Sequence, residues 1–242
     1  MAPGANQILQ TSSNWQMALG ERAALVGFLS QLQPALAIEV GTAQGGSLRP
    51  IATHAQEVHS LDLNFVLEEG LYPNVTFHRG DSHVLLPQLL DQFAREGRTA
   101  DFVLIDGDHT RRGVRRDLEH VLKSSAARST VVLLHDMMNP QCRRGVEDVG
   151  LGSYAHIVYV DLDVVPNVRR VPALRKRWGG LGIIVIEQND ANYRVFDNAI
   201  ARKIRTSPAR ELVRTLVSPA REASHVVAAG RRRARALLRP RS

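Results

Sequence analysis

The chain has 242 residues, 44% of them hydrophobic, which is enough for one large domain or for a domain with an extension. It contains no run of about 18 apolar residues, so we expect no membrane-spanning helix. The single cysteine, Cys142, excludes an intrachain disulfide and a cysteine-cluster zinc site. The first residues lack a basic region followed by an apolar one, which is untypical of a secretory signal. A cytoplasmic enzyme fits these features.

The net charge of +7 is unevenly distributed along the chain. Residues 201–242 carry 12 Lys and Arg against two acids, whereas residues 1–200 carry 19 Lys and Arg against 22 acids. The larger part is therefore mildly acidic, which argues against a nucleic-acid-binding domain. The basic tail would suit contact with anionic lipid heads, nucleic acid or an acidic partner, but such termini also occur without a specific partner.

Hydrophobic periodicity predicts an amphipathic helix over residues 17–33, in which Leu19, Ala23, Val26 and Leu29 or Ser30 recur at helical spacing. This helix is also a candidate surface for a homo-oligomer. Further helices are predicted over 84–95 and 112–123. Short apolar runs closed by glycine or acidic residues predict strands at 35–40, 58–62, 75–80, 101–106, 130–135, 156–160 and 182–187.

Strands that alternate with helices indicate an α/β fold with a mostly parallel sheet and helices on both faces. We expect a helical lead-in at 1–34, the main domain at 35–190 and a basic tail at 191–242. In the tail, short helices are predicted at 209–217 and 220–238, with disorder after about residue 229.

Four of the predicted strands end in a carboxylate, namely Glu39, Asp62, Asp106 and Asp136. In open α/β sheets, ligands bind outside the carboxyl ends of the strands. We therefore expect these four acids to lie at one edge of the sheet, around a binding site.

The segment Glu39-Val40-Gly41-Thr42-Ala43-Gln44-Gly45-Gly46-Ser47 follows a strand and opens a helix, which is typical of a turn that approaches a nucleotide-like ligand. Neither the dinucleotide pattern G-x-G-x-x-G nor a phosphate loop is present, so the ligand need not be a pyrophosphate. Asp62 ends the next strand, 21 residues after Gly41, where a carboxylate can accept hydrogen bonds from a ribose diol. Asp81 and Ser82 close the third strand. For Asp62 and Asp81 the alternative is that they cap helices.

Three motifs together carry a resemblance to a known family. They are E-x-G-x-x-x-G-x-S at 39–47, I-D-G-D-H at 105–109 and L-H-D-M-M-N-P at 134–140, joined by the acid at 62. With them the chain resembles the class I S-adenosylmethionine-dependent methyltransferases over residues 20–190. More narrowly, it is similar to the macrocin and sugar O-methyltransferase-like (methyltransferase 24-type) group.

This resemblance implies a Rossmann-like fold, a seven-stranded mostly parallel sheet whose last strand is antiparallel. It also implies that S-adenosyl-L-methionine is the cofactor. Glu39, Gly41 and Ser47 would then lie around its methionine part, and Asp62 would hold its ribose. Asp81 and Ser82 would flank the adenine, and Asp106 would also lie at the cofactor.

The resemblance also implies a divalent metal, held by an acid that ends the fourth strand and an acidic pair that ends the fifth. Asp106 and Asp136 match these positions, but His135 replaces the second acid of the pair. Oxygen ligands suit Mg²⁺, whereas an imidazole favours Mn²⁺, Fe²⁺ or Zn²⁺. The sequence leaves open that His135 is a buried structural histidine and that the site holds no metal.

His109 matches the general base of the similar sugar O-methyltransferases, and Asp106 is expected to assist it. A sugar hydroxyl must lose its proton to attack a sulfonium methyl group, and a histidine can take that proton. The alternatives are that His109, Asp106 and Asp136 are structural and that Asp108 caps the helix after it.

Other segments are candidates for binding the acceptor. Residues 142–154 are predicted to form a lid loop, and residues 166–180 a second acceptor loop. In the second loop, Trp178 either stacks on a sugar ring or packs against the sheet. Four arginines lie at the start of the helix predicted over 112–123, namely Arg111, Arg112, Arg115 and Arg116. They form a solvent-exposed face of the helix, unless one of them points inward and holds a phosphorylated acceptor such as a nucleotide sugar.

We therefore predict an O-methyltransferase that acts on a hydroxyl group of a small molecule, a sugar or glycosylated metabolite, with possible metal assistance from Mg²⁺ or Mn²⁺. The alternative is a methyltransferase-like module without catalysis that the basic tail tethers to nucleic acid or to a membrane surface. Transfer to nucleic acid itself is disfavoured by the acidic main domain.

Overall fold

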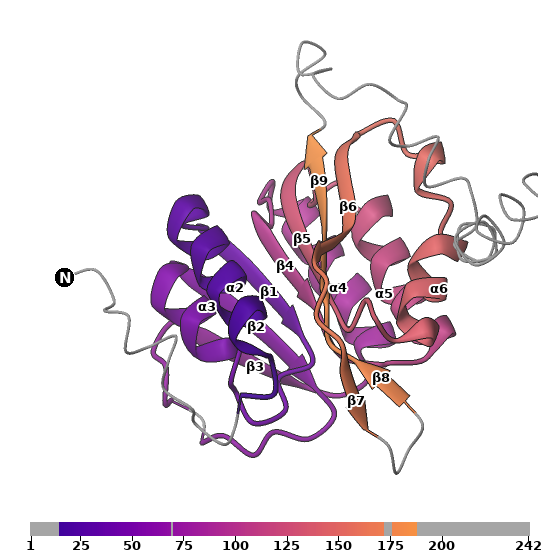
Figure 1. Ribbon diagram of the computed structural model, residues 1–242. Coiled ribbons are helices and arrows are strands. Elements are labelled where there is room, and N and C mark those ends of the chain that lie inside the picture. The colour runs from indigo at the N-terminus through magenta and orange to yellow at the C-terminus, as the bar shows by residue number, and fades with distance from the viewer. Residues whose placement is uncertain (1–14, 69, 172–175, 188–242) are drawn as a thin grey trace, which may run out of the picture. The chain divides into compact units, whose positions relative to one another are not determined.

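The computed structural model describes residues 15–68, 70–171 and 176–187. Seven strands form one sheet in the order β3-β2-β1-β4-β5-β9-β6, and β7 and β8 form a separate pair (Figure 1). The elements are, in chain order, α2 (Leu19–Leu32), β1 (Leu36–Val40), α3 (Leu48–His54), β2 (Glu57–Asp62), β3 (Val75–Arg79), α4 (Ser82–Arg95), β4 (Phe102–Ile105), α5 (Arg111–Lys123), β5 (Ser129–His135), α6 (Pro140–Asp148), the short 3-10 helix η1 (Leu151–Ser153), β6 (Ile157–Val165), β7 (Arg169–Val171), β8 (Lys176–Trp178) and β9 (Leu181–Glu187).

The sheet confirms the predicted α/β fold. Strands β3, β2, β1, β4 and β5 are parallel to one another. The last strand, β9, lies between β5 and β6 and is antiparallel to both. The two central strands β1 and β4 are buried along their whole length, which explains why their sequences are continuous apolar runs and do not alternate.

Helices cover both faces of the sheet. In Figure 1, α2 and α3 lie on one face, and α4, α5 and α6 lie on the other. Leu25 and Leu29 of α2 pack in a core with Ile51 of α3 on the first face. Phe93 of α4 and Leu118 of α5 are fully buried on the second. Each such side chain contributes about 2 kcal/mol from burial, so both layers hold the strand ends in place.

The buried face of α2 differs from the predicted one. Leu19 is 55% exposed, and the side chains that face inward are Glu21, Leu25 and Leu29, four residues apart. The helix therefore presents one fully buried carboxylate among leucines. The prediction was wrong because it chose the helix face by its number of apolar residues. Spacing alone does not show that a glutamate has hydrogen-bond partners in the interior.

The predicted lid loop at 142–154 is also wrong in form. Most of it is helix α6, which begins with Asn139 as N-cap and Pro140 in the first turn, and η1 follows. Cys142 and Val146 are fully buried. The segment packs closely against α5, since a Cβ added to Gly145 would lie 2.6 Å from the carbonyl oxygen of Arg111. It is therefore part of the fixed framework.

The four acids singled out in the sequence lie at one edge of the sheet, at the carboxyl ends of four parallel strands. Glu39 lies in β1, Asp62 ends β2, and Asp106 and Asp136 directly follow β4 and β5. No helix within the described ranges is long and apolar enough to cross a membrane. The predicted tail helices at 209–217 and 220–238 lie outside the described residues.

Candidate active site

A cavity of about 1040 Å³ opens at this edge of the sheet. The glycine turn, the ends of β2, β4 and β5, the start of α4 and the residues around Trp178 all line it. Among the residues that line it are Trp15, Gln16, Met17, Glu21, Arg22, Gly41, Thr42, Ser47, Asp62, Leu63, Asp81, Ser82, His83, Asp106, Asp108, His109, His135, Asp136, Asn167, Trp178 and Gly179.

The glycine turn lies where β1 and β4 end side by side. Gly41 has a φ of 90°, and a Cβ at this position would lie 2.3 Å from the carbonyl oxygen of Asp106. Only glycine permits both this backbone conformation and this approach. The sequence prediction of a tight turn beside the fourth strand is thus explained by a direct contact between the two segments.

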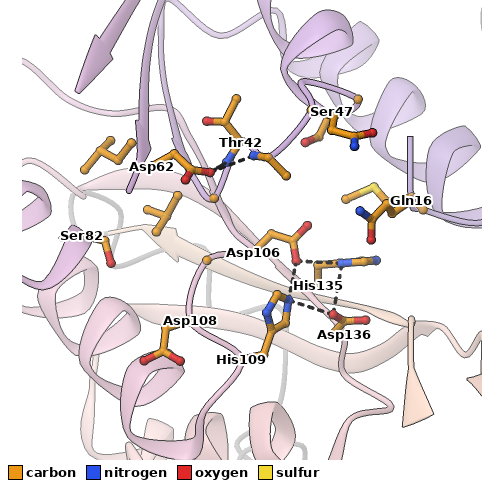
Figure 2. A pocket seen from close by; sticks show the side chains of 18 of the residues that line it. Gln16, Thr42, Ser47, Asp62, Ser82, Asp106, Asp108, His109, His135 and Asp136 are labelled. Atoms are coloured by element: carbon orange, nitrogen blue, oxygen red, sulfur yellow. Dashed lines mark hydrogen bonds and ion pairs between the residues drawn. The ribbon is translucent and has the colours of Figure 1, made fainter. Parts of the chain in front are cut away.

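Asp62 holds the glycine turn in shape. Its Oδ2 atom accepts hydrogen bonds from the amides of Thr42 at 2.9 Å and Ala43 at 2.8 Å, and Oδ1 accepts one from Asn64 at 2.9 Å (Figure 2). The carboxylate also lines the cavity and keeps further lone pairs. Its expected contact with a ribose stays a prediction.

Glu39 lies behind the cavity wall, not in it. It is fully buried and accepts hydrogen bonds from the hydroxyls of Ser47 at 2.7 Å and Ser60 at 2.9 Å. Burial raises its pKa to about 7, although these hydrogen bonds act in the opposite direction. Of the predicted methionine-side residues, Gly41 and Ser47 line the cavity, and Glu39 supports Ser47 from below.

At the far end of the cavity, Asp81 and Ser82 are bound to other protein groups. Asp81 is the N-cap of α4 and accepts a hydrogen bond from the amide of His83 at 2.9 Å. The hydroxyl of Ser82 donates to the buried Asp117 at 3.0 Å. Both residues still line the cavity, so their role beside an adenine stays a prediction.

Three side chains from two strand ends meet in the middle of the cavity (Figure 2). The Nε2 atom of His109 lies 2.9 Å from Oδ2 of Asp136 and 3.3 Å from Oδ1 of Asp106. Asp136 has a φ of 57° and accepts a hydrogen bond from the amide of Gly179, which fixes the direction of its carboxylate. The imidazole is therefore held between two acids and is accessible from the cavity.

This arrangement shifts the pKa values of Asp106 and His109 in opposite directions. Burial alone would raise the pKa of Asp106, but His135 and His109 lower it to about 2. Burial opposes the charged form of His109 as well, yet hydrogen bonds to Asp106 and Asp136 raise its pKa to about 9. The site therefore holds Asp106 ionised and His109 protonated near neutral pH.

His135 lies on the inner side of Asp106. Its Nδ1 atom is 2.9 Å from Oδ1 of Asp106, and its buried Nε2 atom is 3.7 Å from Oε2 of Glu21. Burial opposes protonation of this ring, but the surrounding carboxylates raise its pKa well above the ordinary value. His135 thus connects the reactive acids to a buried glutamate from α2.

Within the described residues, Asp106, His109 and Asp136 form the group whose potential metal-ligand atoms all lie within 4.8 Å of one another. Two carboxylate oxygens and one imidazole nitrogen at this spacing fit a divalent cation, and the imidazole favours a transition metal over Mg²⁺. His109 thus joins the two acids in this group. The predicted ligand His135 lies beside the same acids, with its Nδ1 atom 2.9 Å from Oδ1 of Asp106 and 3.8 Å from Oδ2 of Asp136, and its role as a metal ligand stays a prediction.

Asp108 and Trp178 complete the lower wall. Asp108 accepts hydrogen bonds from the amide and hydroxyl of Thr110 at 2.9 and 3.0 Å, so it shapes the start of α5, whose N-cap is Thr110. Trp178 packs edge-on against His109, with the ring centroids 5.0 Å apart. The 166–180 segment does reach the cavity, through Asn167, Trp178 and Gly179.

The sequence interpretation missed the residues that precede and begin α2. Trp15, Gln16, Met17, Glu21 and Arg22 line the cavity, although they fall in the segment expected to be a helical lead-in. The only local signal was Glu21, a charged residue in register with Leu25 and Leu29 on one helical face.

Comparisons with known proteins agree with this geometry. A family model for a methyltransferase domain matches residues 38–137, which include the glycine turn, Asp62, Asp106, His109 and Asp136. A search of curated proteins finds no match.

Solved structures share the fold at low sequence identity. A putative O-methyltransferase from Klebsiella pneumoniae is 16% identical with a TM-score of 0.52, covering 77% of this chain and 92% of its own. The O-methyltransferase from Bacillus cereus, in complex with S-adenosylhomocysteine, is 16% identical with a TM-score of 0.51, covering 77% and 93%. The O-methyltransferase TomG from Streptomyces achromogenes, in complex with S-adenosylmethionine, is 15% identical with a TM-score of 0.51, covering 71% and 81%.

Proposed function

We propose that this chain, a class I S-adenosylmethionine-dependent methyltransferase, transfers the methyl group to a hydroxyl oxygen of a small molecule. The observation that carries the proposal is the position of His109. Its ring nitrogen lies between Asp106 and Asp136, and all three face the same cavity as the glycine turn and Asp62. The similar folds of several O-methyltransferases support the choice of oxygen as the accepting atom.

In the proposed reaction, a lone pair of the acceptor oxygen attacks the methyl carbon of the sulfonium. The carbon–sulfur bond breaks, its electron pair stays on sulfur, and S-adenosylhomocysteine leaves. The hydroxyl proton passes to Nε2 of His109 in its neutral form. The reacting pair loses the positive charge of the sulfonium during transfer, so alignment contributes more than stabilisation of a new charge.

A metal-assisted variant uses the same residues differently. Asp106 and Asp136 would hold a divalent cation, Mg²⁺ or Mn²⁺, which when bound lowers the pKa of an acceptor hydroxyl. The Nε2 atom of His109 cannot ligate a cation and accept a proton at the same time. Addition of EDTA, followed by restoration with Mn²⁺, therefore decides between a metal-dependent site and a histidine base acting alone.

We further propose that the acceptor is an uncharged sugar or glycosylated metabolite. Within the part of the chain that the structure describes, Arg22 is the single Lys or Arg that lines the cavity. Arg111 and Arg115 of α5 pair on the surface with Asp148 and Glu119. The described residues thus offer no cluster of cations for a phosphorylated acceptor. We also propose that the enzyme acts in the cytoplasm.

One experiment tests the proposal directly. Calorimetric titration with S-adenosylmethionine should show binding, and a panel of hydroxylated acceptors should release S-adenosylhomocysteine, with and without Mg²⁺ or Mn²⁺. Absence of cofactor binding at millimolar concentration would exclude the function. Methylation of amines or thiols with no reaction at hydroxyls would show a different accepting atom.

A further inference from the structure

The residues that precede and begin α2 form the wall of the cavity next to the glycine turn. We call residues 15–22 the N-terminal wall. Figure 2 places Gln16 on the same side of the cavity as Ser47, away from Asp62 and Ser82. If Asp62 and Ser82 mark the nucleoside end of the cofactor, the N-terminal wall faces its methionine end.

The N-terminal wall is held in one conformation. The guanidinium of Arg22 donates from Nε to the carbonyl of Met17 at 2.7 Å and from Nη2 to the carbonyl of Trp15 at 2.5 Å, and it lies 5.1 Å from the Trp15 ring centroid. Glu21 accepts a hydrogen bond from the amide of Ala18 at 2.5 Å. These contacts tie the residues before α2 to its first turn.

The N-terminal wall also touches the glycine turn. A Cβ added to Gly46 would lie 2.6 Å from Cα of Trp15 and 2.8 Å from its Cδ1. No larger residue fits at position 46 without moving the wall. Gln16 and Met17, which follow Trp15, line the same cavity as the turn.

The charge distribution decides which group of the ligand belongs there. Six acids line the cavity, and five of them, which lie outside the N-terminal wall, would repel a carboxylate. The sixth, Glu21, belongs to the wall, but its carboxylate accepts hydrogen bonds from the amides of Ala18 and Gly180 and lies 3.7 Å from Nε2 of His135. The six acids are Glu21, Asp62, Asp81, Asp106, Asp108 and Asp136. Arg22 carries five N–H donors, of which the two backbone contacts use two. Gln16 is exposed to the cavity and adds an amide donor on the same side.

We propose that Gln16 and Arg22 hold the carboxylate of the methionine part of S-adenosylmethionine. This inference rests on the proposed function, because it takes that molecule as the cofactor. It makes the N-terminal wall, which lies before the matched domain at 38–137, a part of the cofactor site.

The test compares two ligands that differ in the amino-acid part. S-Adenosylhomocysteine carries the carboxylate and the ammonium group, and 5′-deoxy-5′-methylthioadenosine lacks both. Binding is measured by calorimetry, with competition for the weaker ligand, on wild type, Gln16→Ala and Gln16→Glu. We expect Gln16→Ala to weaken S-adenosylhomocysteine binding about tenfold and the nucleoside less than twofold. Gln16→Glu should weaken the first ligand further, because it places a negative charge beside the carboxylate.

Several results would overturn the inference. Equal losses for both ligands would mean that Gln16 only shapes the wall. Tighter binding of S-adenosylhomocysteine by Gln16→Glu would place the ammonium group at this position. Gln56→Ala, a glutamine that is exposed and outside the cavity, is the matched control and should bind both ligands like wild type. Failure of wild type to bind S-adenosylhomocysteine would reject the proposed function together with this inference.

Discussion

His109 and Asp136 form an ion pair between two different strand ends, with Nε2 of His109 lying 2.9 Å from Oδ2 of Asp136. The residues follow β4 and β5, which are neighbours in the sheet. The pair therefore exists because two parallel strands end at the same level, and it places the candidate base at the centre of the cavity.

Replacing His109 by alanine should remove the proton acceptor without removing the cofactor site. We expect the methyl transfer rate to fall about 10²- to 10⁴-fold, the usual contribution of a general base. The affinity for S-adenosylhomocysteine should stay within about twofold of wild type, because the residues expected to bind it lie on the other side of Asp106. Single-turnover rates and calorimetry measure the two quantities.

The matched control for this variant is His120→Asn, since His120 lies on α5 and does not line the cavity. It should keep the wild-type rate. Full activity of His109→Ala would show that another group, or water, takes the proton.

The elevated pKa of His109 predicts a pH-dependent rate. Its neutral form is needed to accept a proton, and its pKa is about 9, so kcat/KM should rise as the pH increases from 7 to 9 and then level off. Asp136→Asn removes one of the two carboxylates that raise this pKa. The rising limb should then move to lower pH, as initial rates across pH 6–10 would show.

Asparagine is the suitable replacement at position 136. The backbone there has a φ of 57°, which asparagine tolerates better than alanine does, and an amide oxygen can still accept the hydrogen bond from Gly179. A pH profile unchanged by Asp136→Asn would show that the ionisation observed in the profile belongs to a different group.

The buried Glu39 predicts that stability depends on pH. Its pKa is raised from an ordinary value of 4.5 to about 7 in the folded state. The folded protein thus binds this proton more tightly than the unfolded chain does, and the stabilisation is complete below pH 4.5 and lost as the pH rises through 7. The difference corresponds to about 3 kcal/mol at most.

Urea unfolding at pH 5 and pH 8 compares wild type with Glu39→Gln. The fall in unfolding free energy between the two pH values should be smaller in Glu39→Gln, because glutamine cannot ionise. Glu68→Gln changes an exposed glutamate and should retain the wild-type difference. Identical pH dependence in all three proteins would mean that Glu39 is not protonated in the fold.

Much of the architecture could be predicted because it depends on local patterns. Apolar runs such as 102–105 identify strands that are buried on both faces, and an acid that follows such a run identifies the ligand edge. The predicted strands therefore agree with β1, β2, β4 and β5 within one or two residues, and Asp106 and His109, predicted as site residues from one short motif, both line the cavity.

The error about the buried face of α2 concerns a contact between residues that are far apart in sequence. Glu21 is buried because it accepts a hydrogen bond from the amide of Gly180, 159 residues away, and no local periodicity reports such a partner. His135 also depends on distant partners, and its predicted role as a metal ligand stays a prediction. Its direction is set by Asp106 and Glu21, both outside its own strand.

Replacing Gly41 by alanine should lower both the stability of the fold and the affinity for the cofactor. Alanine at Gly41 must adopt a φ of 90° and place its Cβ 2.3 Å from the carbonyl oxygen of Asp106. The first effect costs about 1–2 kcal/mol, and relieving the second costs about 1–3 kcal/mol more, because the clash is with backbone. The shift of Asp106 should also weaken cofactor binding and slow methyl transfer.

Gly150→Ala separates the two effects. Gly150 also has a positive φ, 69°, but a Cβ there meets no atom within 4 Å. Its alanine variant should therefore show the conformational cost alone, with normal cofactor binding, whereas Gly41→Ala should show the larger loss of unfolding free energy in urea. Equal losses in the two variants would mean that β4 moves freely away from the turn, and the close contact between Gly41 and Asp106 would then not be what fixes the site.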